Sequence, residues 1–273
     1  MLVGILSISN GVALGYPIPP VVLNLSGFAD KCFIGCDPTY PADRKVIEDM
    51  GLRNVEIIDS PWMREVDKGR EIATQMDYLV AYSHTKGAEW VLVLQADELI
   101  HERDYSMLRR FIGATEQSDG PGPYYPDVVG FSMERLYFWG ALNKVRQDWN
   151  ARLIRLFKPG YFSFLAEGTD QAGMYAGQIK PGRVLDLTYN IYHYSRLGSG
   201  KEISKRVRNL DSFFWAEKDL VPAQELPEYD FKTRAYDNYS IVEPPPSVEG
   251  TVVDYDGSHP LGIEEWFGVV PNK

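Results

Sequence analysis

The feature of this sequence that most limits its fold is a run of five apolar residues, Trp90 to Leu94, which ends at Gln95, Asp97 and Glu98. A strand with one face in water alternates apolar and polar residues, whereas a strand of a parallel sheet covered on both faces is apolar throughout. In such sheets, ligands bind in the crevice beyond the carboxyl ends of the strands. We therefore predict that the run is a buried central strand and that the polar residues after it belong to a ligand-binding rim.

The first half of the chain alternates segments typical of strands with segments typical of helices. The expected strands are residues 2–8, 31–36 and 55–58, and the expected helices lie at about residues 43–50 and 70–86. Asp43 is expected to cap the first of these helices. This alternation predicts an α/β fold with a mainly parallel, Rossmann-like sheet and helices on both faces. Asp37, Asp59, Gln95 and Asp97 each follow a predicted strand end, so they should share one rim.

The character of the sequence changes after residue 112, where a Gly/Pro-rich connection leads into aromatic segments. The expected elements there are strands at residues 128–139, 152–157 and 185–194 and a helix at about residues 200–217. We divide the chain into residues 1–112, residues 113–217 of the same domain, and an extended C-terminal region, residues 218–273, that wraps over the body. Within this region, the stretch from His259 to Phe267 predicts either a lid over a ligand or a terminal helix pinned by its apolar residues.

The net charge and the cysteines of the chain limit which binding partners and which cellular compartment we expect. The chain of 273 residues has a net charge of -10 and an isoelectric point of about 5.0, which disfavours nucleic acid as a partner. No apolar segment approaches the roughly 20 residues that a transmembrane helix needs. Cys32 and Cys36 lie in one predicted strand, where a rise of about 3.3 Å per residue separates them by roughly 13 Å, too far for a disulfide. We therefore expect a reduced, cytoplasmic setting.

Carboxylates at the end of a buried strand suit a hard divalent cation. Mg²⁺ and Mn²⁺ prefer oxygen ligands and commonly bridge protein carboxylates to substrate phosphates. Asp97 is the strongest candidate ligand on this reasoning. The alternative is that Asp97 and Glu98 cap a following helix, where acids stabilise the positive end of the helix dipole.

Several motifs, in order along residues 2 to 215, resemble those of a family 2 glycosyltransferase with the GT-A fold. In the first half these are "CDPTYPAD" and "GREIATQMDYLVAYSHTKGAEWVLVLQADE". In the second half, "QDWNARLIRLFKPG", "FLAEGTD" and "YNIYHYSRLGSGKEISKRVRN" are similar to motifs of bacterial lipopolysaccharide-core glucosyltransferase-like members. The resemblance implies a GT-A-like fold in which residues 1–112 bind the nucleotide sugar and residues 113–217 form the acceptor side.

The resemblance also implies a reaction and a donor site. Members of this kind move a sugar, with inversion, from a nucleoside diphosphate sugar to a carbohydrate or other hydroxyl acceptor, assisted by Mn²⁺ or Mg²⁺. Asp37 would hold the nucleoside, beside Ser9 at the end of the first strand. "QAD" replaces the family's Asp-any-Asp motif, so Asp97 is the main metal ligand and Gln95 a neutral second one. His193 would touch the diphosphate or the metal, although a lone histidine in such a segment is also typical of a buried core.

Arg70 heads a predicted helix near the rim, where it would either meet a phosphate or form a surface ion pair with Asp67 or Glu71. Arg152 and Arg155 are three apart in a predicted strand and so face opposite sides, which leaves at most one of them toward the site.

The transfer needs a base for the acceptor hydroxyl. The resemblance places Glu167 in this role, with Asp170 and Asp148 as further candidates. Two other functions use similar sequence features: a nucleotidyltransferase and a noncatalytic carbohydrate-binding protein. The first should carry a lysine-containing, Gly-rich turn after the first strand, and "SISNGVALGYP" has no lysine.

Overall fold

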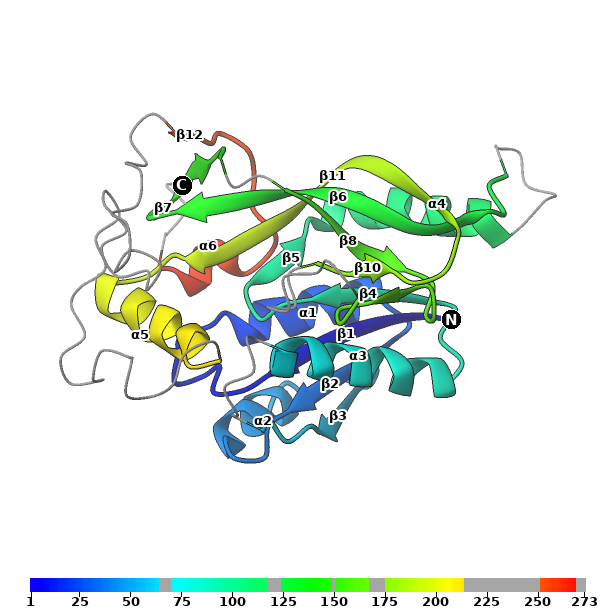
Figure 1. The fold of residues 1–273 in the computed structure, drawn as a ribbon. Coiled ribbons are helices and arrows are strands. Elements are labelled where there is room, and N and C mark those ends of the chain that lie inside the picture. Colours follow the sequence, from blue (N-terminus) through cyan, green and yellow to red (C-terminus); the bar gives the residue numbers. More distant parts are fainter. Residues whose placement is uncertain (64–69, 117–123, 149–150, 167–174, 214–250, 269–273) are drawn as a thin grey trace.

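The structure is a computed structural model that describes residues 1–63, 70–116, 124–148, 151–166, 175–213 and 251–268 (Figure 1). Its helices are α1 (Ile18–Phe28), α2 (Pro41–Glu48), α3 (Arg70–Thr85), α4 (Tyr105–Glu116), α5 (Gly200–Asp211) and α6 (Ile263–Trp266), with a 3₁₀ turn at Glu102–Asp104. Its strands are β1 (Leu2–Ile8), β2 (Lys31–Cys36), β3 (Val55–Asp59), β4 (Trp90–Leu94), β5 (Glu98–Ile100), β6 (Val128–Trp139), β7 (Ala141–Arg146), β8 (Arg152–Phe157), β9 (Phe162–Ser163), β10 (Gly177–Gln178), β11 (Arg183–Arg196) and β12 (Val252–Asp254).

The first four strands form a parallel sheet in the order β3–β2–β1–β4. The pairs Leu6–Leu94 and Ile8–Cys36 stand side by side near the carboxyl ends of these strands. This order, 3-2-1-4, is that of the first four strands of the Rossmann fold. The predicted mainly parallel α/β fold is confirmed for this half of the molecule.

Helices cover both faces of the parallel strands, which explains the apolar run in β4. Trp90, Leu92 and Leu94 belong to the core under α1, α2 and α4, whereas Val91 and Val93 belong to the core under α3. All five side chains are fully buried. In Figure 1, α1 and α3 lie on opposite sides of these strands. Successive side chains of a strand point to opposite faces, so both cores require apolar residues.

The second half of the sheet is mixed. β8 pairs antiparallel with β4 and β6 pairs antiparallel with β8, while β11 runs parallel to β6 and antiparallel to β5. The predicted boundaries of residues 128–139 and 152–157 match β6 and β8. The pairing of β11 with β5 brings this half back to the end of β4.

Two predictions about acidic residues at helix starts are wrong. The residue at the start of α2 is Tyr40, and Asp43 instead accepts hydrogen bonds from the loop after β1. Glu98 caps no helix, because it begins β5 and forms a buried ion pair with Arg155. In both cases a contact from a distant part of the chain replaces the local one.

The described part of the C-terminal region, residues 251–268, packs on the second half of the sheet. β12 extends the edge at β7, and Ile263 in α6 is fully buried. His259 Nδ1 lies 2.9 Å from the hydroxyl of Tyr194, on the face opposite His193, because successive residues of β11 face opposite sides. The short helix α6 is thus pinned by Ile263, whereas Trp266 is 42% exposed, and the lid over a ligand stays a prediction.

Two further observations bear on the sequence predictions. Cys32 and Cys36 are free and buried, and burial raises the pKa of each thiol to about 12. Among the described helices, none has the length and apolar character that crossing a membrane requires.

Candidate functional site

The carboxyl ends of β1, β2 and β4 form the rim that the sequence predicts. Asp37 directly follows β2 and is 2% exposed. Its carboxylate accepts hydrogen bonds from the hydroxyl of Ser9, at 2.7 Å, and from the backbone N–H of Thr39, at 3.0 Å. Asp59 ends β3 at the same edge, but its exposed carboxylate pairs with Arg44 on α2. Ser9 and Asp37 therefore form one polar unit beside the end of β1.

In the loop between β1 and α1, five backbone N–H groups donate hydrogen bonds to acceptors within the protein. Asp43 accepts from the N–H groups of Gly11, at 3.0 Å, and Val12, at 2.8 Å. The N–H groups of Leu14, Gly15 and Tyr16 donate to carbonyl oxygens within the loop. A loop that cradles phosphates must instead direct such groups at the ligand. This loop is consequently a closed turn.

Asp97 lies just beyond β4 and meets His193 of β11. The two side chains are 6% and 4% exposed, and Asp97 Oδ1 is 3.6 Å from His193 Nε2. Burial and the nearby Glu98 carboxylate raise the pKa of Asp97 to about 7. Burial and the charges of Arg135 and Arg196 hold the pKa of His193 well below its usual value. The His193 ring stacks on Tyr137, with 4.6 Å between ring centres, and this fixes its direction toward Asp97.

The donor set at this point fits a divalent cation that also takes ligands from a substrate. Within the described residues, no group of three His, Cys, Asp or Glu side chains is arranged to hold a metal. A neutral imidazole and a carboxylate supply two donors, and Mg²⁺ is commonly held by one or two carboxylates together with substrate phosphates and water. Gln95 directly follows β4 and is half-buried, and its side-chain oxygen is a third possible ligand, two residues before Asp97. The described residues alone therefore do not form a complete metal-binding site.

Glu98, the residue after Asp97, forms a buried ion pair with Arg155. Both side chains are 0% exposed, and Arg155 donates from Nε to Glu98 Oε2 at 2.9 Å and from Nη2 to Oε1 at 2.8 Å. Glu98 Oε2 also accepts the N–H of Gln95 at 3.0 Å. This bidentate pair joins β5 to β8. Arg152, as strand parity predicts, faces the other way and donates to Ser132 and the carbonyl of Leu187.

The remaining predicted site residues are spread along the chain. Arg70 begins α3 and is exposed. Asp148 accepts two hydrogen bonds from Arg146, and these lower the pKa of its carboxyl. A lowered pKa makes Asp148 a weak base. Glu167 and Asp170 lie outside the described residues.

Arg206 is a site residue that sequence reasoning missed. It projects from α5, is 2% exposed, and donates to the carbonyl oxygens of Leu14, at 2.8 Å, Gly15, at 2.6 Å, and Leu197, at 2.6 Å. Its guanidinium lies over the Tyr16 ring at 5.1 Å, and its charge acts on Asp97. The signal in the sequence is a basic residue within the apolar face of a helix, beside Ile203 and Val207.

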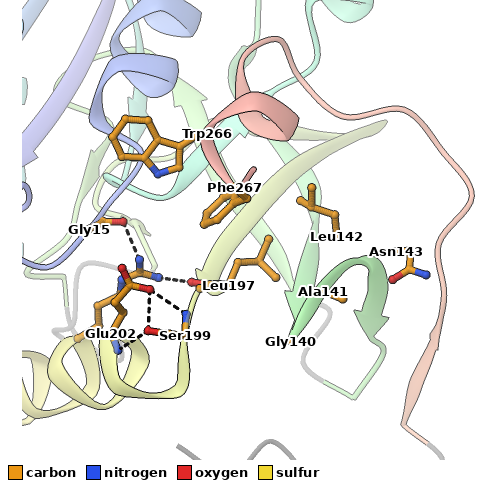
Figure 2. A pocket seen from close by; sticks show the side chains of 12 residues that line it. Gly15, Gly140, Ala141, Leu142, Asn143, Leu197, Ser199, Glu202, Trp266 and Phe267 are labelled. Atoms are coloured by element: carbon orange, nitrogen blue, oxygen red, sulfur yellow. Dashed lines mark hydrogen bonds between the residues drawn. The ribbon is translucent and has the colours of Figure 1, made fainter. Parts of the chain in front are cut away.

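Arg206 also lines a cavity of about 870 Å³ (Figure 2). Its walls come from the turn between β6 and β7, the start of α5, the loop after β1 and the end of α6. Gly15, Gly140 and Gly198 line it, and all three have positive φ angles, at 68°, 74° and 114°. Glycine adopts this conformation at little steric cost. The three turns can therefore bend tightly around the space.

The strand order, the polar rim and the mixed second half together define an α/β protein with a Rossmann-like parallel half. No family model and no curated protein matches this chain. Among solved structures, TarS 1–349 from S. aureus aligns over 89% of this chain and 73% of that one, at 14% identity and a TM-score of 0.43. A 4-diphosphocytidyl-2C-methyl-D-erythritol synthase aligns over 69% and 89%, at 13% identity and 0.39. A putative glucose-1-phosphate thymidylyltransferase from Bacillus anthracis aligns over 70% and 89%, at 10% identity and 0.40. At these scores the alignments assign neither a family nor an activity to this chain.

Proposed function

We propose that this protein is a glycosyltransferase that moves a sugar, with inversion, from a nucleoside diphosphate sugar to an acceptor hydroxyl. The observation that supports this most is the placement of Asp37 and Asp97 on one rim, with β1 between their strands. Adjacent strands are about 4.8 Å apart, so the two positions are roughly 10 Å apart across the sheet. That spacing suits a ligand with a nucleoside at one end and a diphosphate at the other. The motifs similar to bacterial lipopolysaccharide-core glucosyltransferase-like members agree with this proposal.

Each rim residue has a role in this proposal. Ser9 and Asp37 bind the nucleoside through hydrogen bonds, and Asp97 with His193 and Gln95 would hold Mn²⁺ or Mg²⁺. When bound, the cation would offset the negative charge of the diphosphate. A base takes the proton of the acceptor hydroxyl while the hydroxyl oxygen bonds to the anomeric carbon of the donor sugar. The bond from that carbon to the phosphate oxygen breaks, and the diphosphate leaves with the electron pair.

The loop after β1 argues against a nucleotidyltransferase. Such an enzyme must hold a triphosphate, and a Gly-rich loop does so by aiming its backbone N–H groups at the phosphates. Here five of these groups, at residues 11, 12, 14, 15 and 16, donate within the protein. The loop also contains no lysine.

The function is tested by two measurements on the same protein. A thermal-shift screen of nucleoside diphosphate sugars with Mn²⁺ identifies the donor, and release of free nucleoside diphosphate on adding an acceptor reports transfer. We expect a donor that stabilises the fold and is consumed only when an acceptor is present. Stabilisation without turnover across a wide acceptor set would point instead to the noncatalytic alternative.

Asp37→Ala is expected to raise the donor KM far more than it lowers kcat. A hydrogen bond to a charged group contributes about 1.5–3 kcal/mol, which corresponds to a rise of roughly 10-fold to 100-fold in KM. Asp59→Ala is the matched control, because Asp59 ends the neighbouring strand but pairs with Arg44. Steady-state kinetics with varied donor distinguishes them. A loss confined to kcat would place Asp37 in the chemical step instead.

Glu167→Gln is expected to lower kcat by at least about 100-fold while donor affinity stays within a few-fold, because a general base contributes typically 100-fold to 10,000-fold. Asp148→Asn is the comparison variant, and its effect should be small because Arg146 already neutralises that carboxylate. If Glu167→Gln retains its turnover and Asp170→Asn loses it, the base is Asp170.

A further inference from the structure

The cavity beside Arg206 has two walls of different chemistry. One wall carries Trp266 and Phe267 from the end of α6, with Leu142 from β7. The other carries the polar side chains of Ser199 and Glu202 at the start of α5 (Figure 2). The volume of about 870 Å³ falls within the roughly 300–1,000 Å³ of small-molecule sites. An apolar wall facing hydrogen-bonding groups suits a ligand with one apolar face and a polar edge.

A pyranose ring has this pair of surfaces. Its axial C–H groups form an apolar face that packs on an aromatic ring, and its hydroxyl groups lie around the edge. Trp266 offers a large ring that is 42% exposed although it belongs to a segment anchored in the core. Aromatic rings with exposed faces in a cavity are typical binding surfaces for such ligands.

Glu202 offers a charged acceptor for the hydroxyl edge. Its Oε2 accepts the N–H of Ser199 at 2.8 Å and the hydroxyl of Ser199 at 2.9 Å, and the N–H of Glu202 donates to Ser199 Oγ at 3.3 Å, which completes a capping box. These bonds lower the pKa of Glu202, so it is a carboxylate at neutral pH. Within the described residues, Oε1 accepts no hydrogen bond. A Cβ at Gly198 would lie 2.9 Å from Oε2, so only glycine leaves the carboxylate this position.

Arg206 joins this cavity to the donor rim. The same guanidinium lines the cavity, holds the loop after β1 and acts electrostatically on Asp97. The loop after β1 therefore borders both places, because Ser9 at its start belongs to the donor rim and Gly15 lines the cavity. For direct transfer, a second substrate must bind beside the donor.

The C-terminal region is fastened where it supplies the aromatic wall. The N–H of Leu261 donates to Glu102 Oε1 at 3.0 Å, and Ser258 Oγ lies 2.9 Å from His101 Nε2. Ile263 is fully buried one turn before Trp266. These contacts with the 3₁₀ turn and with His101 before it hold the segment that carries Trp266.

We propose that this cavity is the acceptor site, that it binds a pyranose ring stacked on Trp266 with a hydroxyl bonded to Glu202, and that residues 251–268 thereby select the acceptor. The acceptor role rests on the glycosyltransferase function proposed above, whereas the binding of a pyranose does not.

Saturation-transfer NMR tests the binding directly, with the methyl glycosides of glucose, galactose, mannose and N-acetylglucosamine as probes. We expect at least one to bind the full chain, with contact to the C–H groups of one ring face. Trp266→Ala should weaken that binding about 10-fold or more, and Trp266→Phe less. Leu261→Ala is the matched control, because Leu261 is 74% exposed on the same segment but does not line the cavity. Glu202→Gln keeps the capping box and should also weaken binding.

The donor measurements separate this inference from the proposed function. Trp266→Ala should leave the thermal shift by the nucleoside diphosphate sugar unchanged and raise only the acceptor KM. If donor binding and transfer occur but no probe binds, or if Trp266→Ala binds as the wild type does, the inference is overturned and the proposed function stands. If a probe binds at Trp266 but no nucleoside diphosphate sugar stabilises the protein, the acceptor role is overturned together with the proposed function.

Discussion

Replacing Asp97 with Asn is expected to lower kcat by about 100-fold to 1,000-fold while the fold remains intact. A positioned electrostatic group at the centre of charge development has typically this effect. The fold should survive because the backbone carbonyl of Asp97, not its side chain, accepts the N–H of Tyr194 at 2.9 Å. Release of nucleoside diphosphate measures the activity, and thermal unfolding measures the fold.

The controls for Asp97 use the same region. Asp104→Asn removes another buried carboxylate, one beyond β5, and should retain activity. Gln95→Asp introduces the Asp-any-Asp pattern of family 2 glycosyltransferases, and affinity for Mn²⁺ should rise if this position faces the proposed metal. Wild-type turnover in a correctly folded Asp97→Asn protein would remove this residue from the site.

Arg155→Met is expected to lower the free energy of unfolding by about 3–5 kcal/mol. Removing one partner of a buried ion pair leaves the other charge without compensation, and measured losses are of this size. Both Glu98 and Arg155 are 0% exposed, so water cannot replace the lost partner in the folded protein. Chemical denaturation followed by circular dichroism gives the value.

A double variant and an exposed pair provide the comparison. Glu98→Leu with Arg155→Met removes both charges and should recover most of the loss, because apolar residues of similar volume often replace buried pairs without net cost. Lys45→Met breaks a pair whose side chains are 74% and 62% exposed and should cost less than about 1 kcal/mol. Equal effects from Arg155→Met and Lys45→Met would contradict the burial of the Glu98–Arg155 pair.

The local patterns of the sequence determined the elements of the first half and their arrangement. The unbroken run from Trp90 to Leu94 requires cover on both faces, and the alternation of strands and helices places that cover. Parallel strands align their carboxyl ends, so the positions of Asp37 and Asp97 on one rim followed from the same patterns. Hydrophobic periodicity and strand ends are properties of neighbouring residues, which is why the sequence alone carries them.

The tertiary structure alone decided which distant side chains meet at the site. His193 reaches Asp97 only because β11 pairs with β5, and Arg155 reaches Glu98 only because β8 lies beside β4. Arg206 donates a hydrogen bond to the carbonyl oxygen of Gly15, which lies 191 residues earlier in the sequence, in the loop after β1. Strand order and register depend on how the whole core packs, and no local preference specifies them. The sequence therefore indicated the rim and its main carboxylates, whereas the partners of those carboxylates and the cavity beside them required the folded chain.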